Sequence, residues 1–121
     1  MAETLKPQSD EQARDAVAWA LSEELPLEVA GRGTKRTLGR PMQTAHTLDL
    51  SAFSGIDIYE PEELILRAGA ATPLAEVEAA LAEKNQELAF EPADLGPLLG
   101  GEEGKGTLGG VVASNLSGPR R

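Results

Sequence analysis

In the stretch LEVAGRGTK, residues 27–35, a short and mostly apolar segment is followed directly by two glycines separated by an arginine. Leu27–Ala30 predicts a strand, and Gly31–Lys35 predicts the loop that follows it. Glycines permit positive φ, and without a Cβ they let an anion approach the backbone N–H groups. The candidate contacts are the backbone at Gly31 and Gly33, the hydroxyl of Thr34 and the charges of Arg32, Lys35 and Arg36. These are the parts of a phosphate or pyrophosphate loop, and a surface turn with incidental basic residues is the alternative.

The charge of this loop contrasts with that of the whole chain. The 121 residues have a net charge of −9, yet Gly31–Arg40 holds four of the eleven positive charges and no carboxylate. Nucleic acids and anionic membranes are bound by broad basic faces, so neither is an expected partner. A small anionic ligand is compatible with a single basic loop.

Composition excludes several kinds of site within these residues. The chain has no cysteine, which excludes disulfides, thiolate metal ligands and a cysteine nucleophile. His46 is the single histidine, so no metal site is predicted, and a structural or solvated role for His46 is favoured over that of a base or ligand. No apolar run approaches the length of a membrane span or signal peptide, and a cytoplasmic protein is expected.

Helical and strand patterns alternate along the chain, which predicts an α+β fold with short mixed sheets flanked by helices. An amphipathic helix is predicted over Ser9–Glu24 behind a capping box of Ser9 and Gln12, with an apolar face that includes Val17 and Leu21. A second helix is predicted with Thr72 as N-cap, Pro73 at the first helical position and a stop at Asn85. The other predicted strands are His46–Leu50, Ile56–Tyr59, Leu64–Ala68 and Leu88–Phe90, with the middle two forming a hairpin.

A second glycine-rich region lies further along the chain. Seven of the fifteen residues in Gly96–Gly110 are glycine, which predicts a long loop, and Thr107 then caps a short helix rich in small residues. Gly109 and Gly110 expose backbone at the start of that helix, where free N–H groups favour an anion or a polar ring edge. Close helix packing through small residues is the alternative reading, and both can hold together.

Two common phosphate-binding motifs do not fit. The dinucleotide fingerprint G-x-G-x-x-G requires a glycine at Arg36. The Walker motif around Gly104-Lys105 requires a glycine at Leu99 and a serine or threonine at Gly106. The loops therefore belong to neither a Rossmann nor a P-loop site.

Taken together, these residues resemble the FAD-binding domain of the vanillyl-alcohol oxidase type, also called the p-cresol methylhydroxylase (PCMH) type. That family has a G-x-G-[ST] loop after an early strand and a T-[LIV]-G-G helix start further on, which appear here as Gly31–Thr34 and Thr107–Gly110. Between them, LRAGAATPLAEV at Leu66–Val77 is similar to the family's strand, A-G and helix. LGRP at Leu38–Pro41, TLDLS at Thr47–Ser51 and the terminal GPRR are similar to the FAD-binding subunits of glycolate oxidases.

The resemblance implies a flavoprotein and a set of cofactor contacts. It places the FAD pyrophosphate on Gly31–Lys35, with further contacts from Pro92, Thr107, Gly109, Gly110, Asn115 and Gly118. Some relatives attach FAD covalently through a histidine in the first loop, where this chain has Arg32, so the implied binding is non-covalent. The implied reaction transfers hydride from a small 2-hydroxy acid to FAD, and electrons then pass to companion flavin and iron–sulfur subunits.

The resemblance also implies that residues 1–121 are the N-terminal portion of a PCMH-type FAD-binding domain, expected to be a fragment that is inactive alone. No catalytic residue is assigned within it. The expected location is cytoplasmic, peripheral to the inner membrane only through partner subunits. The alternative function is that of a non-enzymatic α+β module that docks a partner subunit in a multi-protein complex.

Overall fold

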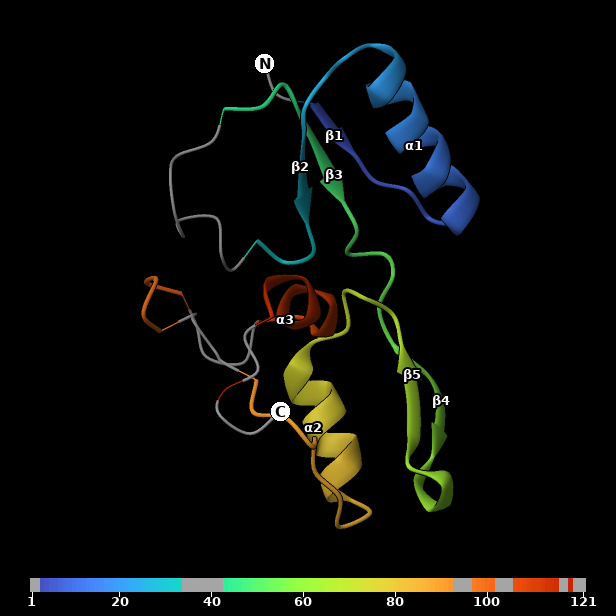
Figure 1. The fold of residues 1–121 in the computed structure, drawn as a ribbon, viewed down its shortest axis with the longest axis vertical. Coiled ribbons are helices and arrows are strands. Elements are labelled where there is room, and N and C mark those ends of the chain that lie inside the picture. Colours follow the sequence, from blue (N-terminus) through green and yellow to red (C-terminus); the bar gives the residue numbers. More distant parts are fainter. Residues whose placement is uncertain (1–2, 34–42, 93–96, 102–105, 116–117, 119–121) are drawn as a thin grey trace.

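The computed structural model describes residues 3–33, 43–92, 97–101, 106–115 and 118. They form three helices, five short strands and one 3₁₀ turn, which confirms the α+β class (Figure 1). The elements in chain order are β1 Glu3–Leu5, α1 Asp10–Ser22, β2 Leu27–Ala30, β3 His46–Asp49, β4 Ile56–Glu60, the 3₁₀ turn Pro61–Glu63, β5 Ile65–Ala68, α2 Leu74–Ala82 and α3 Leu108–Ser114.

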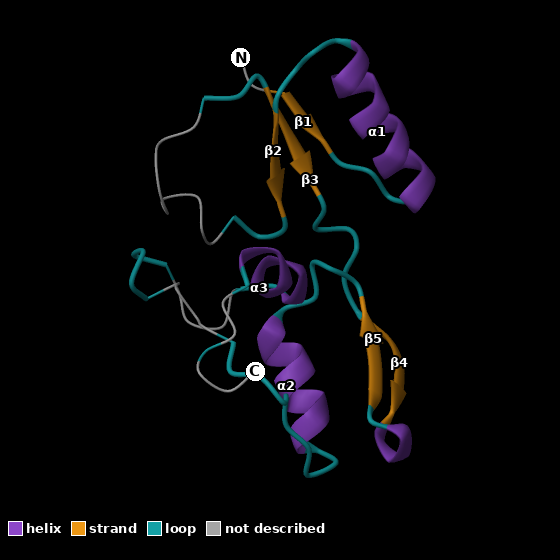
Figure 2. Cartoon of the chain, in the orientation of Figure 1, coloured by secondary structure: helices purple, strands orange, loops and turns teal. Residues whose placement is uncertain are grey.

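The first three strands form a parallel sheet in the order β1-β3-β2 (Figure 2). β1 was not predicted, because three residues carry too little pattern and the strand exists through its pairing with β3. The register pairs Thr4 with Thr47 and Ala30 with Asp49. Because all three strands run the same way, their carboxyl ends meet at one edge, where Leu50 N–H donates to Ala30 O at 2.8 Å.

The predicted first helix is confirmed and packs against one face of this sheet. Ser9 is its N-cap, with Ser9 Oγ accepting from Gln12 N–H at 3.2 Å. Trp19 meets His46 edge-on at a ring distance of 5.2 Å, and Leu48, which alternation places on the same face as His46, is buried. The opposite face of the sheet carries the polar residues Thr47 and Asp49.

The hairpin and second helix are also confirmed, with one correction. β4 and β5 pair antiparallel, and α2 follows them. The residue predicted as N-cap, Thr72, is not the cap: Pro73 takes that place. The Thr72 hydroxyl instead accepts from Gly55 N–H at 2.9 Å and donates to Gly55 O at 3.3 Å, at a position with 0% exposure. Thr72 therefore ties the start of α2 to the connection that leads into the hairpin.

Replacing Thr72 with valine keeps its shape and removes both of these hydrogen bonds. We expect Thr72→Val to lower the free energy of unfolding by about 1–3 kcal/mol, since it leaves a part-buried Gly55 N–H without an acceptor. Urea denaturation measures the change. The matched variant Thr4→Val, at an exposed strand position, should change it by less than about 0.5 kcal/mol. Equal losses in the two variants would contradict this role for Thr72.

The third helix joins the two parts of the fold. Figure 1 shows α3 between the three-stranded sheet and α2. An antiparallel bridge links Pro73 and Thr107, with Leu74 N–H donating to Gly106 O at 2.9 Å. Val77 of α2 and Val111 of α3 are among the most buried side chains. The predicted strand at Leu88–Phe90 is wrong, because this segment pairs with no strand among the described residues and lies along α2 as irregular chain.

Candidate functional site

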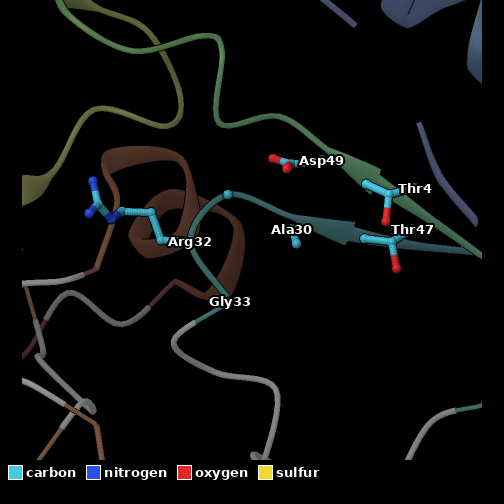
Figure 3. A pocket seen from close by; sticks show the side chains of 7 residues that line it. Thr4, Ala30, Arg32, Gly33, Thr47 and Asp49 are labelled. Carbon is cyan, nitrogen blue, oxygen red and sulfur yellow. The ribbon is translucent and has the colours of Figure 1, made fainter. Parts of the chain in front are cut away.

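A pocket of about 280 Å³ opens where β2 and β3 end, on the polar face of the parallel sheet. Figure 3 shows Thr4 and Thr47 at one end of it and Arg32 at the other, with Asp49 between them. The pocket is lined by Thr4, Ala30, Gly31, Arg32, Gly33, Thr47 and Asp49. Three of the sequence-predicted contacts, Gly31, Arg32 and Gly33, thus meet in one cavity. Thr34, Lys35 and Arg36 lie outside the described residues.

Both glycines of the loop suit its geometry, for different reasons. Gly33 has φ 71, in the left-handed region that favours glycine. A Cβ on Gly31 would lie 3.2 Å from Thr107 Oγ1 and 3.3 Å from Thr107 Cγ2, closer than side chains normally approach. Thr107 itself is buried, with 6% exposure. The two glycine motifs, far apart in sequence, are therefore in contact.

The loop offers backbone donors and one described cation. Within the described residues, the N–H groups of Gly31, Arg32 and Gly33 donate no hydrogen bond to another protein atom. The Arg32 side chain is exposed and lines the pocket. Successive N–H groups without protein acceptors, beside a guanidinium, suit an anionic oxygen ligand.

The start of α3 does not offer free donors, contrary to the expectation from sequence. Leu108 N–H donates to Thr72 O at 3.0 Å and Gly109 N–H to Ala70 O at 2.8 Å. Gly110 N–H donates to Thr107 Oγ1 at 3.1 Å, and Val111 N–H to Thr107 O at 3.1 Å. The N–H groups of Leu108, Gly109 and Gly110 are therefore used within the protein, and Val111 makes the first hydrogen bond of this seven-residue helix itself. Thr107 shapes the wall behind the loop.

The alternative reading of close packing through small residues holds at α3. A Cβ on Gly109 would lie 2.8 Å from both Ala70 Cβ and Ala70 O. Asn115 caps the helix at its other end with φ 54. Gly109 and Asn115 thus have structural roles, and any cofactor contact from them stays a proposal.

Pro92 and Gly118 form a second group, away from the pocket. Gly118 has φ +67, and a Cβ there would lie 2.7 Å from Glu91 Cβ, next to Pro92. Pro92 lines a separate groove beside α2. The predicted site residues therefore fall into two groups, Gly31–Gly33 with Thr107 and Pro92 with Gly118.

Four residues that line the pocket were not predicted as contacts: Thr4, Ala30, Thr47 and Asp49. Thr47 Oγ1 donates to Glu28 Oε2 at 3.2 Å, and Asp49 Oδ1 accepts from Ser51 N–H at 2.8 Å, so both side chains are held. The alternation in His46–Leu50 was a usable signal, because it separates Thr47 and Asp49 from Leu48. Thr4 had no such signal, since β1 was not predicted.

His46 has the structural role that was expected for it. Its side chain is 14% exposed, with Nε2 lying 3.3 Å from Glu3 Oε2. Its buried Nδ1 has no hydrogen-bond partner among the described residues. Among the described residues, no three carboxylate or imidazole side chains lie together in a group that could hold a metal ion. In the same part of the chain, no helix is both long and apolar enough to cross a membrane.

Two comparisons with known proteins bear on the family of the chain. The family described as "FAD binding domain" matches residues 2–121. The chain is also 41% identical over 107 residues to glycolate oxidase subunit GlcE of Escherichia coli (strain K12), a match covering 88% of this chain and 28% of that protein. The chain thus spans somewhat over a quarter of the curated relative it matches. The match along nearly all of the sequence shows that the chain belongs to the FAD binding domain family.

Proposed function

We propose that residues 1–121 supply the pyrophosphate-binding part of a non-covalent FAD site in a subunit of a 2-hydroxy acid (glycolate) oxidase. The observation that carries this proposal is the Gly31–Gly33 loop, whose N–H groups have no protein acceptor within the described residues and which opens into a pocket. Membership of the FAD binding domain family supplies the identity of the ligand.

The residues present fit the diphosphate portion of such a cofactor. The positive φ of Gly33 turns the chain, and the missing Cβ at Gly31 lets the loop pack on Thr107. Arg32 contributes a charge that no described carboxylate pairs with. In this proposal Thr34 and Lys35 add a hydroxyl and an ammonium donor. With Arg32 in place of a histidine, the loop has no side chain for a covalent flavin link.

The remaining predicted contacts are assigned supporting roles in the proposal. Thr107 forms the wall against which Gly31 rests, and Gly110 N–H donates to the Thr107 hydroxyl. We assign Gly109 and Gly110 the role of holding this wall in place. Pro92, Asn115 and Gly118 do not line this pocket, and we assign them contacts with the rest of the cofactor. FAD, when bound, accepts the hydride of the substrate, and the described residues bind and orient it. No residue of this chain is assigned to act on the substrate.

The proposed place of the chain is in a complex. The relative is named as a glycolate oxidase subunit, and we propose companion flavin and iron–sulfur subunits that receive electrons from the bound FAD. We also propose that the protein is cytoplasmic and is attached to the membrane only through those partner subunits.

The direct test is the flavin content of the full-length protein. We expect the purified protein to carry FAD, to show the flavin absorbance bands, and to release the flavin into the supernatant on heat or acid denaturation because no covalent link exists. Residues 1–121 alone should bind FAD much more weakly. A full-length protein that fails to take up added FAD would overturn the proposal, and flavin that stays with the denatured chain would overturn its non-covalent form.

A docking module without flavin is the second candidate function, favoured by the acidic surface. It predicts partner binding that does not change when Gly33 or Gly110 is replaced by a bulky residue, and no flavin in the protein. The flavin measurement therefore separates the two candidates.

A further inference from the structure

Helix α1 carries a wider apolar stripe than its own sheet covers. The sequence predicts one apolar face from Ala13 to Leu21, but the sheet buries only the small residues, with Ala20 at 3% exposure. The two larger aliphatic side chains, Val17 and Leu21, are 50% and 79% exposed. At i and i+4 they lie together on one flank of the helix. This Val17/Leu21 flank is the uncovered half of the stripe.

The side chain that continues the stripe on its other flank has a partner. Trp19 packs edge-on against His46 of β3. Trp19 is itself 41% exposed, so this contact covers it only in part, whereas Val17 and Leu21 are more exposed still, at 50% and 79%. A helix whose largest aliphatic residues face outward fits a surface that is buried by another protein.

The ends of this flank are negatively charged. Asp10 and Glu11 lie in the first turn, and Glu23 and Glu24 follow the last turn, in which there is no basic residue. Carboxylates at a helix C-terminus add to the negative end of the macrodipole, where cations are favoured. Glu24 also has φ 55, a conformation that glycine adopts without strain. No basic residue in the last turn of α1 balances the negative charge beside Leu21.

The one basic side chain on α1 does not change this sign. Arg14 Nη2 lies 4.0 Å from Glu11 Oε1, and Arg14 Nε lies 3.9 Å from Asp15 Oδ1. Its charge is shared between two carboxylates that flank it. The surface around Val17 and Leu21 therefore complements aliphatic side chains bordered by lysine or arginine.

We propose that the Val17/Leu21 flank of α1 is the docking surface for a companion protein subunit, one that presents an aliphatic patch with a basic rim. This inference rests on the proposed function, which places the chain in a multi-subunit complex. The surface lies on the face of the sheet opposite the pocket, so docking there leaves the proposed FAD loop open.

The test compares binding of the full-length protein to the purified companion flavin and iron–sulfur subunits with that of three variants. We expect Leu21→Glu to weaken association at least tenfold, and the double variant Glu23→Lys/Glu24→Lys to weaken it severalfold. The wild-type affinity should also fall as salt is added. Leu98→Glu is the matched control, because Leu98 is 78% exposed on a different segment, and it should bind like the wild type.

Each result has a defined meaning. If the wild type binds the companions and Leu21→Glu binds within twofold of it, the proposed surface is wrong. If Leu21→Glu abolishes only self-association, seen as a halved mass in light scattering, the occupant is a second copy and the proposal is wrong. A protein that carries FAD but binds neither companion also overturns it while leaving flavin binding intact. Flavin content should be equal in all three variants.

Discussion

Gly69→Ala should lower the free energy of unfolding by at least about 3 kcal/mol, the largest stability effect that we expect from a single methyl group in this chain. A Cβ on Gly69 would lie 2.2 Å from Phe53 O and 2.6 Å from Phe53 C. These are backbone atoms, so no side-chain rotation relieves the clash. The same carbonyl oxygen accepts from Ala71 N–H at 2.9 Å, and Gly69 N–H donates to Gly55 O at 3.0 Å. Moving the segment to make room breaks these bonds.

Gly106→Ala is the control for Gly69→Ala. No heavy atom lies within 4 Å of a Cβ built on Gly106, and its φ is outside the left-handed region. We expect a change of no more than about 0.5 kcal/mol. Urea denaturation of the full-length protein gives both values. If the two variants unfold at the same urea concentration, the close backbone approach of Gly69 to Phe53 does not contribute to stability as we expect.

Local signals in the sequence were sufficient for most elements and for the loop. The capping residues of α1, the alternation in β4 and the threonine before α3 each act within a few residues, so they could be read directly. The G-x-G loop was also identifiable, because positive φ at Gly33 is a property of that residue. These features depend little on distant parts of the chain.

The features that the sequence did not predict depend on contacts with residues that are distant in the chain. β1 exists because β3 pairs with it, and Thr72 serves Gly55 rather than the helix it precedes. The N–H groups of Leu108 and Gly109 at the start of α3 looked free because their acceptors, Thr72 and Ala70, are distant in sequence. Likewise, the pattern marked Val17 and Leu21 as apolar without showing that both stay exposed beside the three-stranded sheet.

For cofactor affinity, we expect the largest effect at Gly33. In the full-length protein, Gly33→Val should weaken FAD binding at least about 30-fold, or ~2 kcal/mol. A β-branched residue is strongly disfavoured at φ 71. The backbone would move to negative φ, and the N–H groups of Arg32 and Gly33 would no longer face the same pocket. Fluorescence titration of the flavin-free protein with FAD measures the change.

Gly100→Val separates this effect from backbone strain in general. Gly100 also has positive φ, +83, with nothing within 4 Å of a Cβ, and it lies outside the pocket. Its variant bears a similar conformational cost and should bind FAD like the wild type. Equal affinities for the Gly33 and Gly100 variants would show that the loop does not hold the pyrophosphate. If only Gly33→Val loses FAD affinity, then FAD binding depends on the backbone conformation of this loop and not on its positive charge alone.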